Sequence, residues 1–213
     1  MSKEIEIVAK HWNEYSPQFD EAHNTENLDV WRKELGKLIS GNQGAKVLDI
    51  GTGTGFLALM VAELGYESYG IDIAEDMLEL GRQHAKERNV SVNFLNGEGE
   101  HLPFEDNCFE ALVNARVLWT LLDPDVSFSE WIRVIKPDGK LLSFIRHPNP
   151  DKQIEPSFYG EEFDIKLPLR QATNELYIEY MERAGFKNVK IIPLPEEMSR
   201  ADATPWMAVY GEK

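Results

Sequence analysis

Three alternating glycines and a carboxylate further along the chain point most directly to ligand chemistry. Gly51, Gly53 and Gly55 follow the short apolar segment 46–50, and Asp72 ends the next apolar segment. Glycines let a backbone turn sharply and approach a ligand closely, while a carboxylate about 20 residues later accepts hydrogen bonds from ribose hydroxyls. This spacing predicts a nucleoside-containing cofactor. The alternatives are a simple connecting turn at the glycines and a helix N-cap at Asp72, which is compatible with ribose binding.

The residue after the third glycine separates two kinds of nucleotide site. A dinucleotide site has the pattern G-x-G-x-x-G, but its last position is occupied here by Phe56. A triphosphate loop requires Gly-Lys-Ser/Thr, which this loop lacks. An NAD-dependent oxidoreductase is therefore the weaker enzymatic alternative. A protein that binds the cofactor without turnover is the non-enzymatic alternative.

Short apolar segments alternate along the chain with segments of helical periodicity. The predicted strands lie at 46–50, 67–71, 90–94, 109–115, 141–145, 189–192 and 206–210. Such alternation is typical of a parallel sheet covered by helices on both faces. The last two strands are joined without a helix, so the last strand is expected to be antiparallel. We predict an α/β fold with a doubly wound, mostly parallel, seven-stranded Rossmann-like sheet and an N-terminal helical extension.

The length of 213 residues predicts a single domain. Its expected parts are an N-terminal helical cap at 1–40, a cofactor-binding core at 45–146, a substrate-side insertion at 147–172, and a C-terminal helix with strands at 173–213. The insertion is rich in proline and glycine and has no clear period.

The first helix carries apolar residues at helical spacing, among them Val8, Trp12 and Tyr15. Pro17 is expected to end this helix. Because the helix precedes the first strand, we expect His11, Trp12 and Tyr15 to belong to a lid over the ligand pocket. The alternative, which the sequence leaves open, is one more structural helix that packs on the domain.

Composition narrows the choice of partner. The net charge is −15, and an acidic surface repels phosphate backbones, so we expect neither nucleic acid nor an anionic membrane as a partner.

The single cysteine, Cys108, excludes an internal disulfide. No group of His, Asp and Glu has metal-ligand spacing, so no metal is expected. The sequence has no secretory signal or apolar run of membrane length, which favours the cytoplasm, and it leaves the oligomeric state open.

The chain resembles the class I S-adenosylmethionine-dependent methyltransferases. The matching segments are Val47-Leu-Asp-Ile-Gly-Thr-Gly-Thr-Gly55, Gly70-Ile-Asp-Ile-Ala74 with Met77, Asn96-Gly-Glu-Gly-Glu-His-Leu-Pro-Phe104, Ala115-Arg-Val-Leu118 and Arg133-Val-Ile-Lys-Pro-Asp-Gly139. They occur in order from about Val47 to Leu142. The set is most similar to the small-molecule branch that includes the ubiquinone and menaquinone biosynthesis methyltransferases. The resemblance implies methyl transfer from S-adenosylmethionine to an unidentified small molecule.

The resemblance also assigns residues to the cofactor. These are Tyr15, Asp49, Gly51, Thr52, Gly53, Asp72, Ile73, Met77, Glu98, Gly99, Ala115 and Arg116. It places the glycine loop under the methionine part, Asp72 on the ribose, and Ile73 with Met77 on the two faces of the adenine. Glu98 accepts from the adenine amine, although the family usually has Asp there. Asp138 likewise replaces a glycine of the usual Pro-Gly-Gly turn.

On the acceptor side, Trp119 and His147 follow the fourth and fifth predicted strands, so we expect them near the substrate. The resemblance implies that Tyr15 hydrogen-bonds the methionine carboxylate. A sulfonium makes its methyl group electrophilic, so the protein mainly has to hold an acceptor in line. A general base is needed only when the acceptor must lose a proton. We therefore assign no catalytic residue. His147 is either a base or a loop residue near the pocket, and Trp119 is either a substrate platform or part of the core.

Overall fold

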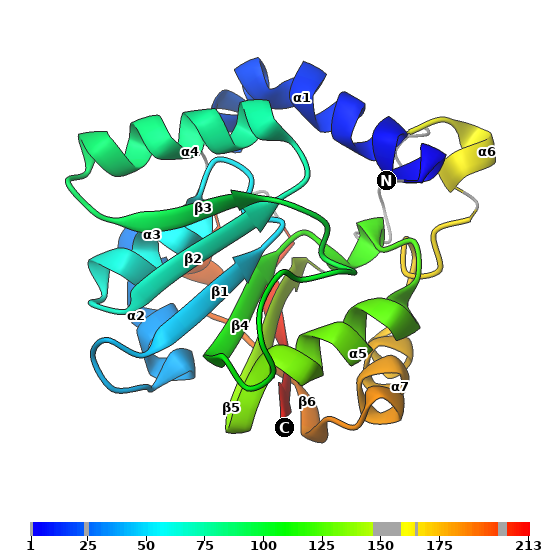
Figure 1. The fold of residues 1–213 in the computed structure, drawn as a ribbon. Helices are drawn as coiled ribbons and strands as arrows, with labels where there is room; N and C mark the ends of the chain where they lie inside the picture. Colours follow the sequence, from blue (N-terminus) through cyan, green and yellow to red (C-terminus); the bar gives the residue numbers. More distant parts are fainter. Residues whose placement is uncertain (1, 24–25, 147–158, 165, 200–203) are drawn as a thin grey trace.

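A layer of strands runs through the middle of the molecule, with helices on both faces (Figure 1). The computed structural model describes residues 2–23, 26–146, 159–164, 166–199 and 204–213. The strands are β1 (Lys46–Ile50), β2 (Glu67–Asp72), β3 (Val92–Asn96), β4 (Phe109–Ala115), β5 (Ile135–Arg146), β6 (Lys187–Pro193) and β7 (Trp206–Glu212). The helices are α1 (Lys3–His23), α2 (Leu28–Ile39), α3 (Phe56–Glu63), α4 (Glu75–Glu87), α5 (Pro124–Val134), α6 (Glu161–Asp164) and α7 (Asn174–Ala184), with 3-10 turns η1 (Leu118–Thr120) and η2 (Glu196–Met198).

The seven-stranded sheet has the order β3-β2-β1-β4-β5-β7-β6. β1 pairs in parallel with β2 and β4, whereas β7 is antiparallel to both β5 and β6. The predicted α/β fold with an antiparallel last strand is confirmed. The bounds differ in part: β3 begins at Val92 rather than at Val90, β5 begins at Ile135 rather than at Leu141, and the turn η2 lies between the last two strands. Strand order reverses between β1 and β4, and open α/β sheets bind ligands at such a switch point.

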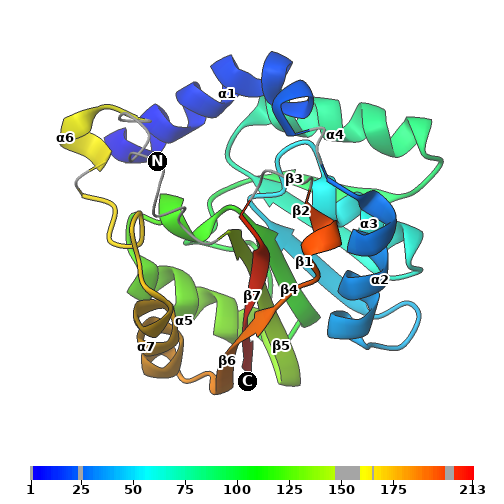
Figure 2. The ribbon, with the colours of Figure 1, turned by 180° about the vertical axis from the view of Figure 1, so that it is seen from behind.

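Helices bury both faces of the sheet. On the face seen in Figure 2, Trp31 and Leu35 of α2 and Met60 of α3 pack in one buried cluster with Phe144 of β5. On the opposite face, α5 and α7 contribute Phe128, Trp131, Tyr177 and Met181 to a second cluster. α1 lies across the carboxyl ends of the parallel strands (Figure 1). Within the described residues, no helix combines the length and apolarity needed to cross a membrane.

Local capping signals fix several helix ends at the predicted positions. The side chains of Asn27, Asp123 and Thr173 accept hydrogen bonds from the first turns of α2, α5 and α7, which satisfies amide groups that have no partner within the helix. Gly185 follows α7 with φ of 104°, a left-handed conformation that glycine adopts without strain. These ends set where the neighbouring strands begin.

The first helix does not end at Pro17, and that prediction is wrong. α1 continues to His23 with Pro17 inside it. Proline lacks the amide hydrogen that would bond the carbonyl of Asn13, but the Ser16 hydroxyl donates to that carbonyl at 2.9 Å. Ser16 is 5% exposed, so a buried side chain replaces the missing backbone bond, and α1 continues past Pro17 to His23.

Candidate active site

The glycine loop between β1 and α3 has a backbone that only glycine adopts easily. Gly51, Gly53 and Gly55 have φ of 63°, 55° and 87°. A Cβ atom at Gly51 would lie 2.5 Å from Cγ2 of Val117, which is closer than real carbon contacts allow. Gly51 and Gly53 line a cavity at the switch point of the sheet, so they bring bare backbone to its surface.

Asp49 supports this loop from below. Its Oδ2 accepts hydrogen bonds from the Thr52 hydroxyl at 2.6 Å and from the Ala58 amide at 3.0 Å. Asp49 is only 2% exposed, and burial raises its pKa to about 7, because a carboxylate loses hydration in the interior. The Thr52 hydroxyl therefore stabilises the loop. The Thr52 amide also donates to the carbonyl of Ile71 at 3.1 Å.

Asp72 joins the glycine loop to the end of β2. Its Oδ2 accepts from the Gly53 amide at 2.7 Å, and its Oδ1 accepts from the Ala74 amide at 2.9 Å. Burial raises the pKa of Asp72, and these hydrogen bonds oppose the rise. Ala74, not Asp72, occupies the N-cap position of α4, so the N-cap alternative for Asp72 is wrong. The carboxylate keeps lone pairs for two further donors, as ribose hydroxyls would supply.

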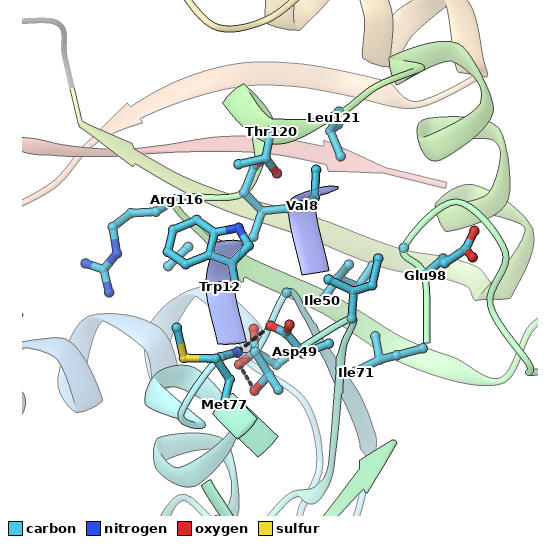
Figure 3. A pocket seen from close by; sticks show the side chains of 18 of the residues that line it. Val8, Trp12, Asp49, Ile50, Ile71, Met77, Glu98, Arg116, Thr120 and Leu121 are labelled. Carbon is cyan, nitrogen blue, oxygen red and sulfur yellow. Dashed lines mark hydrogen bonds between the residues drawn. The ribbon is translucent and has the colours of Figure 1, made fainter. Parts of the chain in front are cut away.

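A cavity of about 290 Å³ lies over the loop and under α1. The lining residues are Ile5, Val8, Trp12, Tyr15, Phe19, Asp49, Ile50, Gly51, Thr52, Gly53, Phe56, Leu57, Ile71, Asp72, Ile73, Met77, Gly97, Glu98, Gly99, Glu100, Ala115, Arg116, Val117, Trp119, Thr120, Leu121 and Leu122. Every residue that the sequence assigned to the cofactor is in this set, and so is Trp119. His147 lies outside the described residues. Figure 3 shows Val8 and Trp12 reaching the cavity from α1, with Asp49 and Met77 below them.

One end of the cavity is lined by residues that follow β2 and β3. Ile73 and Met77 follow β2, while Glu98 and Gly99 follow β3, its neighbour in the sheet. The Gly99 carbonyl is fixed by the indole N–H of Trp131 at 2.8 Å. Oε2 of Glu98 lies 3.6 Å from Nδ1 of His101, at the rim of the cavity. A carboxylate at this rim is able to accept from an exocyclic amine.

Arg116 lines the cavity, but its guanidinium points away from the other labelled side chains (Figure 3). Nη1 lies 3.6 Å from Oε1 of Glu26 and the group lies over the ring of Trp206 at 5.3 Å. The side chain of Glu26 is 3% exposed and also pairs with Arg146 at 2.7 Å. Burial lowers the pKa of Arg116 to about 10, so it stays protonated at neutral pH. Its charge is held in this buried cluster.

The opposite wall comes mainly from α1 and from the segment after β4, and the sequence revealed only part of it. Phe19 lies beyond Pro17, so the predicted end of the helix concealed it; its ring lies within 3.9 Å of a Cβ built on Gly53. The Asp20 carboxylate accepts from the Thr54 hydroxyl at 2.7 Å and lies 3.2 Å from His84. The helical spacing of apolar residues in α1 continues past Pro17. This spacing is the sequence signal by which Phe19 could have been predicted at the site.

An open α/β sheet with a glycine loop at the switch point and a carboxylate after the next strand defines a Rossmann-like nucleoside-binding protein. A sequence profile described as "Methyltransferase domain" matches residues 48–143. The demethylmenaquinone methyltransferase of Listeria monocytogenes serotype 4b (strain CLIP80459) is 34% identical over 216 residues, covering 88% of this chain and 90% of that protein. The protein of the same name from Thermus thermophilus is 32% identical over 162 residues, covering 74% of this chain and 73% of that protein. The chain therefore belongs to the class I S-adenosylmethionine-dependent methyltransferases and uses S-adenosylmethionine to methylate a small molecule.

Solved structures share the fold at low sequence identity. The [4+2]-cyclase SpnF superposes with a TM-score of 0.77 at 18% identity, covering 97% of this chain and 94% of that one. A SAM-dependent methyltransferase from Aquifex aeolicus gives a TM-score of 0.66 at 21% identity, covering 85% and 88%. Family membership overturns the NAD-dependent alternative, consistent with Phe56 at the position of the third glycine. Family membership also argues against the non-enzymatic alternative, in which the protein binds the cofactor without turnover.

Proposed function

We propose that this methyltransferase acts on a neutral, apolar acceptor that carries a flat ring, as demethylmenaquinone does. That compound gives its name to the curated relatives in Listeria and Thermus. The observation that carries the proposal is the wall of the cavity opposite the glycine loop. It is formed by the rings of Trp12 and Trp119 and by aliphatic side chains of Ile5, Val8 and Leu121. Apolar and aromatic walls of this kind favour ligands that bury a large apolar surface.

The charges around the cavity argue against an anionic acceptor. The lining residues include Asp49, Asp72, Glu98 and Glu100, and among the described ones Arg116 alone carries a cationic side chain. Its guanidinium is already held by Glu26. Phosphate and carboxylate groups are usually bound through Arg or Lys forks. The acceptor wall offers no such fork among the described residues that line it.

The remaining residues have roles toward the cofactor that this proposal includes. Asp72 holds the ribose, Ile73 and Met77 pack on the adenine, and Glu98 accepts from its amine. The glycine loop supports the methionine part. The residues fit this group because the positive φ angles of Gly51 and Gly53 favour glycine, so bare backbone lines the cavity at the loop. α1 acts as a lid that excludes water from the reacting atoms, and Tyr15 faces the methionine end.

When bound, S-adenosylmethionine supplies an electrophilic methyl group on a positively charged sulfur. The acceptor gives up one proton for the methyl group that it gains. This chain's contribution is to hold the acceptor in line with the methyl group and to keep water out. Correct placement alone supplies a large part of the rate enhancement in reactions of this kind. The aromatic wall is the part of the cavity that performs this placement.

Turnover with matched acceptors tests the proposal. The purified protein is incubated with S-adenosylmethionine and either chemically reduced demethylmenaquinone with a short side chain or phosphoethanolamine. Mass spectrometry then follows the methylated product and S-adenosylhomocysteine. We expect methylation of the quinol and none of the phosphate-bearing amine. Turnover of phosphoethanolamine, or failure to methylate the quinol while S-adenosylhomocysteine still binds, would contradict the proposed acceptor and leave the cofactor site intact.

A further inference from the structure

Tyr159, just before α6, contacts the two tryptophans of the acceptor wall and is not among the residues that line the cavity. The indole N–H of Trp12 on α1 donates to the Tyr159 hydroxyl at 2.9 Å. The ring of Trp119 stacks on Tyr159 with a centroid distance of 5.9 Å and an interplanar angle of 22°. Trp12 and Trp119 meet each other edge to face at 6.5 Å. One tyrosine thus contacts both rings.

The position of Tyr159 is fixed by groups that the cavity does not contain. Its amide donates to Oδ1 of Asp164 at 3.1 Å, and Asp164 is 6% exposed and forms an ion pair with Arg170. The ring of Phe163 packs against Tyr159 at 5.3 Å. Burial raises the pKa of the Tyr159 hydroxyl, so this group stays neutral and keeps its lone pairs for the indole. α6 and the residues after it therefore hold Tyr159 in place.

The support matters because the two tryptophans reach the cavity from separate parts of the chain. Trp12 lies on α1, and Trp119 lies on η1 after β4. A tryptophan side chain rotates about two single bonds, so its ring plane is set by what surrounds it. A flat acceptor that packs on these rings takes its orientation from them, and an error of about 1 Å in placement costs about 100-fold in rate.

We propose that Tyr159 is a positioning residue for the acceptor: it holds Trp12 and Trp119 in the arrangement that forms the acceptor wall, and it ties α1 to the α6 segment. This inference rests on the proposed acceptor site, but the hydrogen bond that it invokes is measurable without any acceptor. The hydroxyl is the group that distinguishes this role from simple packing. Tyr159→Phe removes the hydroxyl and keeps the ring.

The direct measurement is hydrogen exchange at the indole N–H groups, observed by NMR with saturating S-adenosylhomocysteine. The signal of Trp12 is identified by its loss in Trp12→Phe. A neutral hydrogen bond of this kind corresponds to about a fivefold change in exchange, so we expect Tyr159→Phe to speed exchange at Trp12 about fivefold. The indole of Trp131, which donates to the Gly99 carbonyl at 2.8 Å, is the internal control and should not change.

Kinetics then separate positioning from stability. With the reduced quinone as acceptor, kcat/KM for the acceptor should fall severalfold in Tyr159→Phe, while the affinity for S-adenosylhomocysteine stays within about twofold. Tyr177→Phe, which changes a buried tyrosine of α7 that is 8% exposed, is the matched control and should leave both quantities unchanged. Unchanged exchange at Trp12 in Tyr159→Phe, or equal acceleration at Trp131, would overturn the inference. If the wild type does not methylate the quinol, the proposed acceptor fails, and the exchange result still decides whether the Tyr159 hydroxyl holds Trp12.

Discussion

Oδ1 of Asn13 on α1 accepts a hydrogen bond from the backbone amide of Asp76, in the first turn of α4, at 3.0 Å. The N-cap residue of α4 itself is Ala74, whose side chain accepts no capping bond. The cap of α4 is therefore supplied by another helix. This bond joins the helix that covers the cavity to the helix that follows Asp72 and carries Met77.

Removing this cap should loosen both helices. Replacement of a capping side chain by alanine costs about 1 kcal/mol, so Asn13→Ala should lower the free energy of unfolding by about that amount. It should also speed amide exchange in α1. Denaturant unfolding and hydrogen exchange measure the two effects. Asn27→Ala is the control, because Asn27 caps its own helix α2; it should cost a similar amount without affecting α1. Equal exchange of α1 in both variants would show that the Asn13 bond does not hold that helix.

The second prediction concerns the carboxylate at the end of β2. Asp72→Asn leaves one acceptor oxygen, which is unable to serve the amides of both Gly53 and Ala74 and also a ribose. Hydrogen bonds to a charged group are worth about 1.5–3 kcal/mol, so affinity for S-adenosylhomocysteine should fall by about 10- to 150-fold in calorimetry. Asp76→Asn removes an exposed carboxylate from α4 and should have little effect. Undiminished binding by Asp72→Asn would remove Asp72 from the cofactor site.

Glu98 is predicted to accept a hydrogen bond from the adenine amine. Glu98→Ala should weaken binding of S-adenosylhomocysteine about tenfold, since it removes a charged acceptor, and Glu98→Gln should weaken it less. The sharper readout is the analogue in which inosine replaces adenosine, because inosine has an oxygen in place of the amine. The wild type should bind this analogue more weakly, and Glu98→Ala should lose the preference. A preference that persists in Glu98→Ala would mean that Glu98 only faces His101 and solvent.

The sequence predicts best what short-range geometry determines. Asn27 and Asp123 cap helices within three residues of themselves, so their pattern is visible in the chain. The glycine loop and Asp72 are equally recognisable, since parallel strands bring their carboxyl ends to one edge of the sheet. Asn13 caps a helix 63 residues away, and Tyr159 contacts Trp12 across 147 residues. Pairings at such distances depend on how whole elements pack, and no local pattern specifies them.

Pro17 shows a different limit. The rule that proline ends a helix rests on the backbone hydrogen bond that proline is unable to donate. It does not include a neighbouring hydroxyl that donates to the same carbonyl, as the Ser16 hydroxyl does. The continuation of α1 then places Phe19 and Asp20 beside the glycine loop. One local rule therefore hid a set of contacts at the site.

The last prediction is a pH dependence that arises from Asp49. Burial raises its pKa from 3.8 to about 7 in the folded protein, so between about pH 4 and pH 7 the folded state holds a proton that the unfolded state has released. Stability from this group is complete below about pH 4 and falls as the pH rises to about 7, by at most about 1.4 kcal/mol per pH unit. Asn at this position does not titrate. Its single carbonyl oxygen is able to accept from both Thr52 and Ala58, because both bond the same oxygen of Asp49. The free energy of unfolding of Asp49→Asn and of the wild type is measured in denaturant at several pH values. Subtracting one from the other removes the contribution of the other carboxylates, which both proteins share. We expect the variant to become more stable relative to the wild type as the pH rises from about 4 to about 7. A difference that stays constant over this range would mean that Asp49 is ionised in the folded protein, held by its hydrogen bonds in spite of burial.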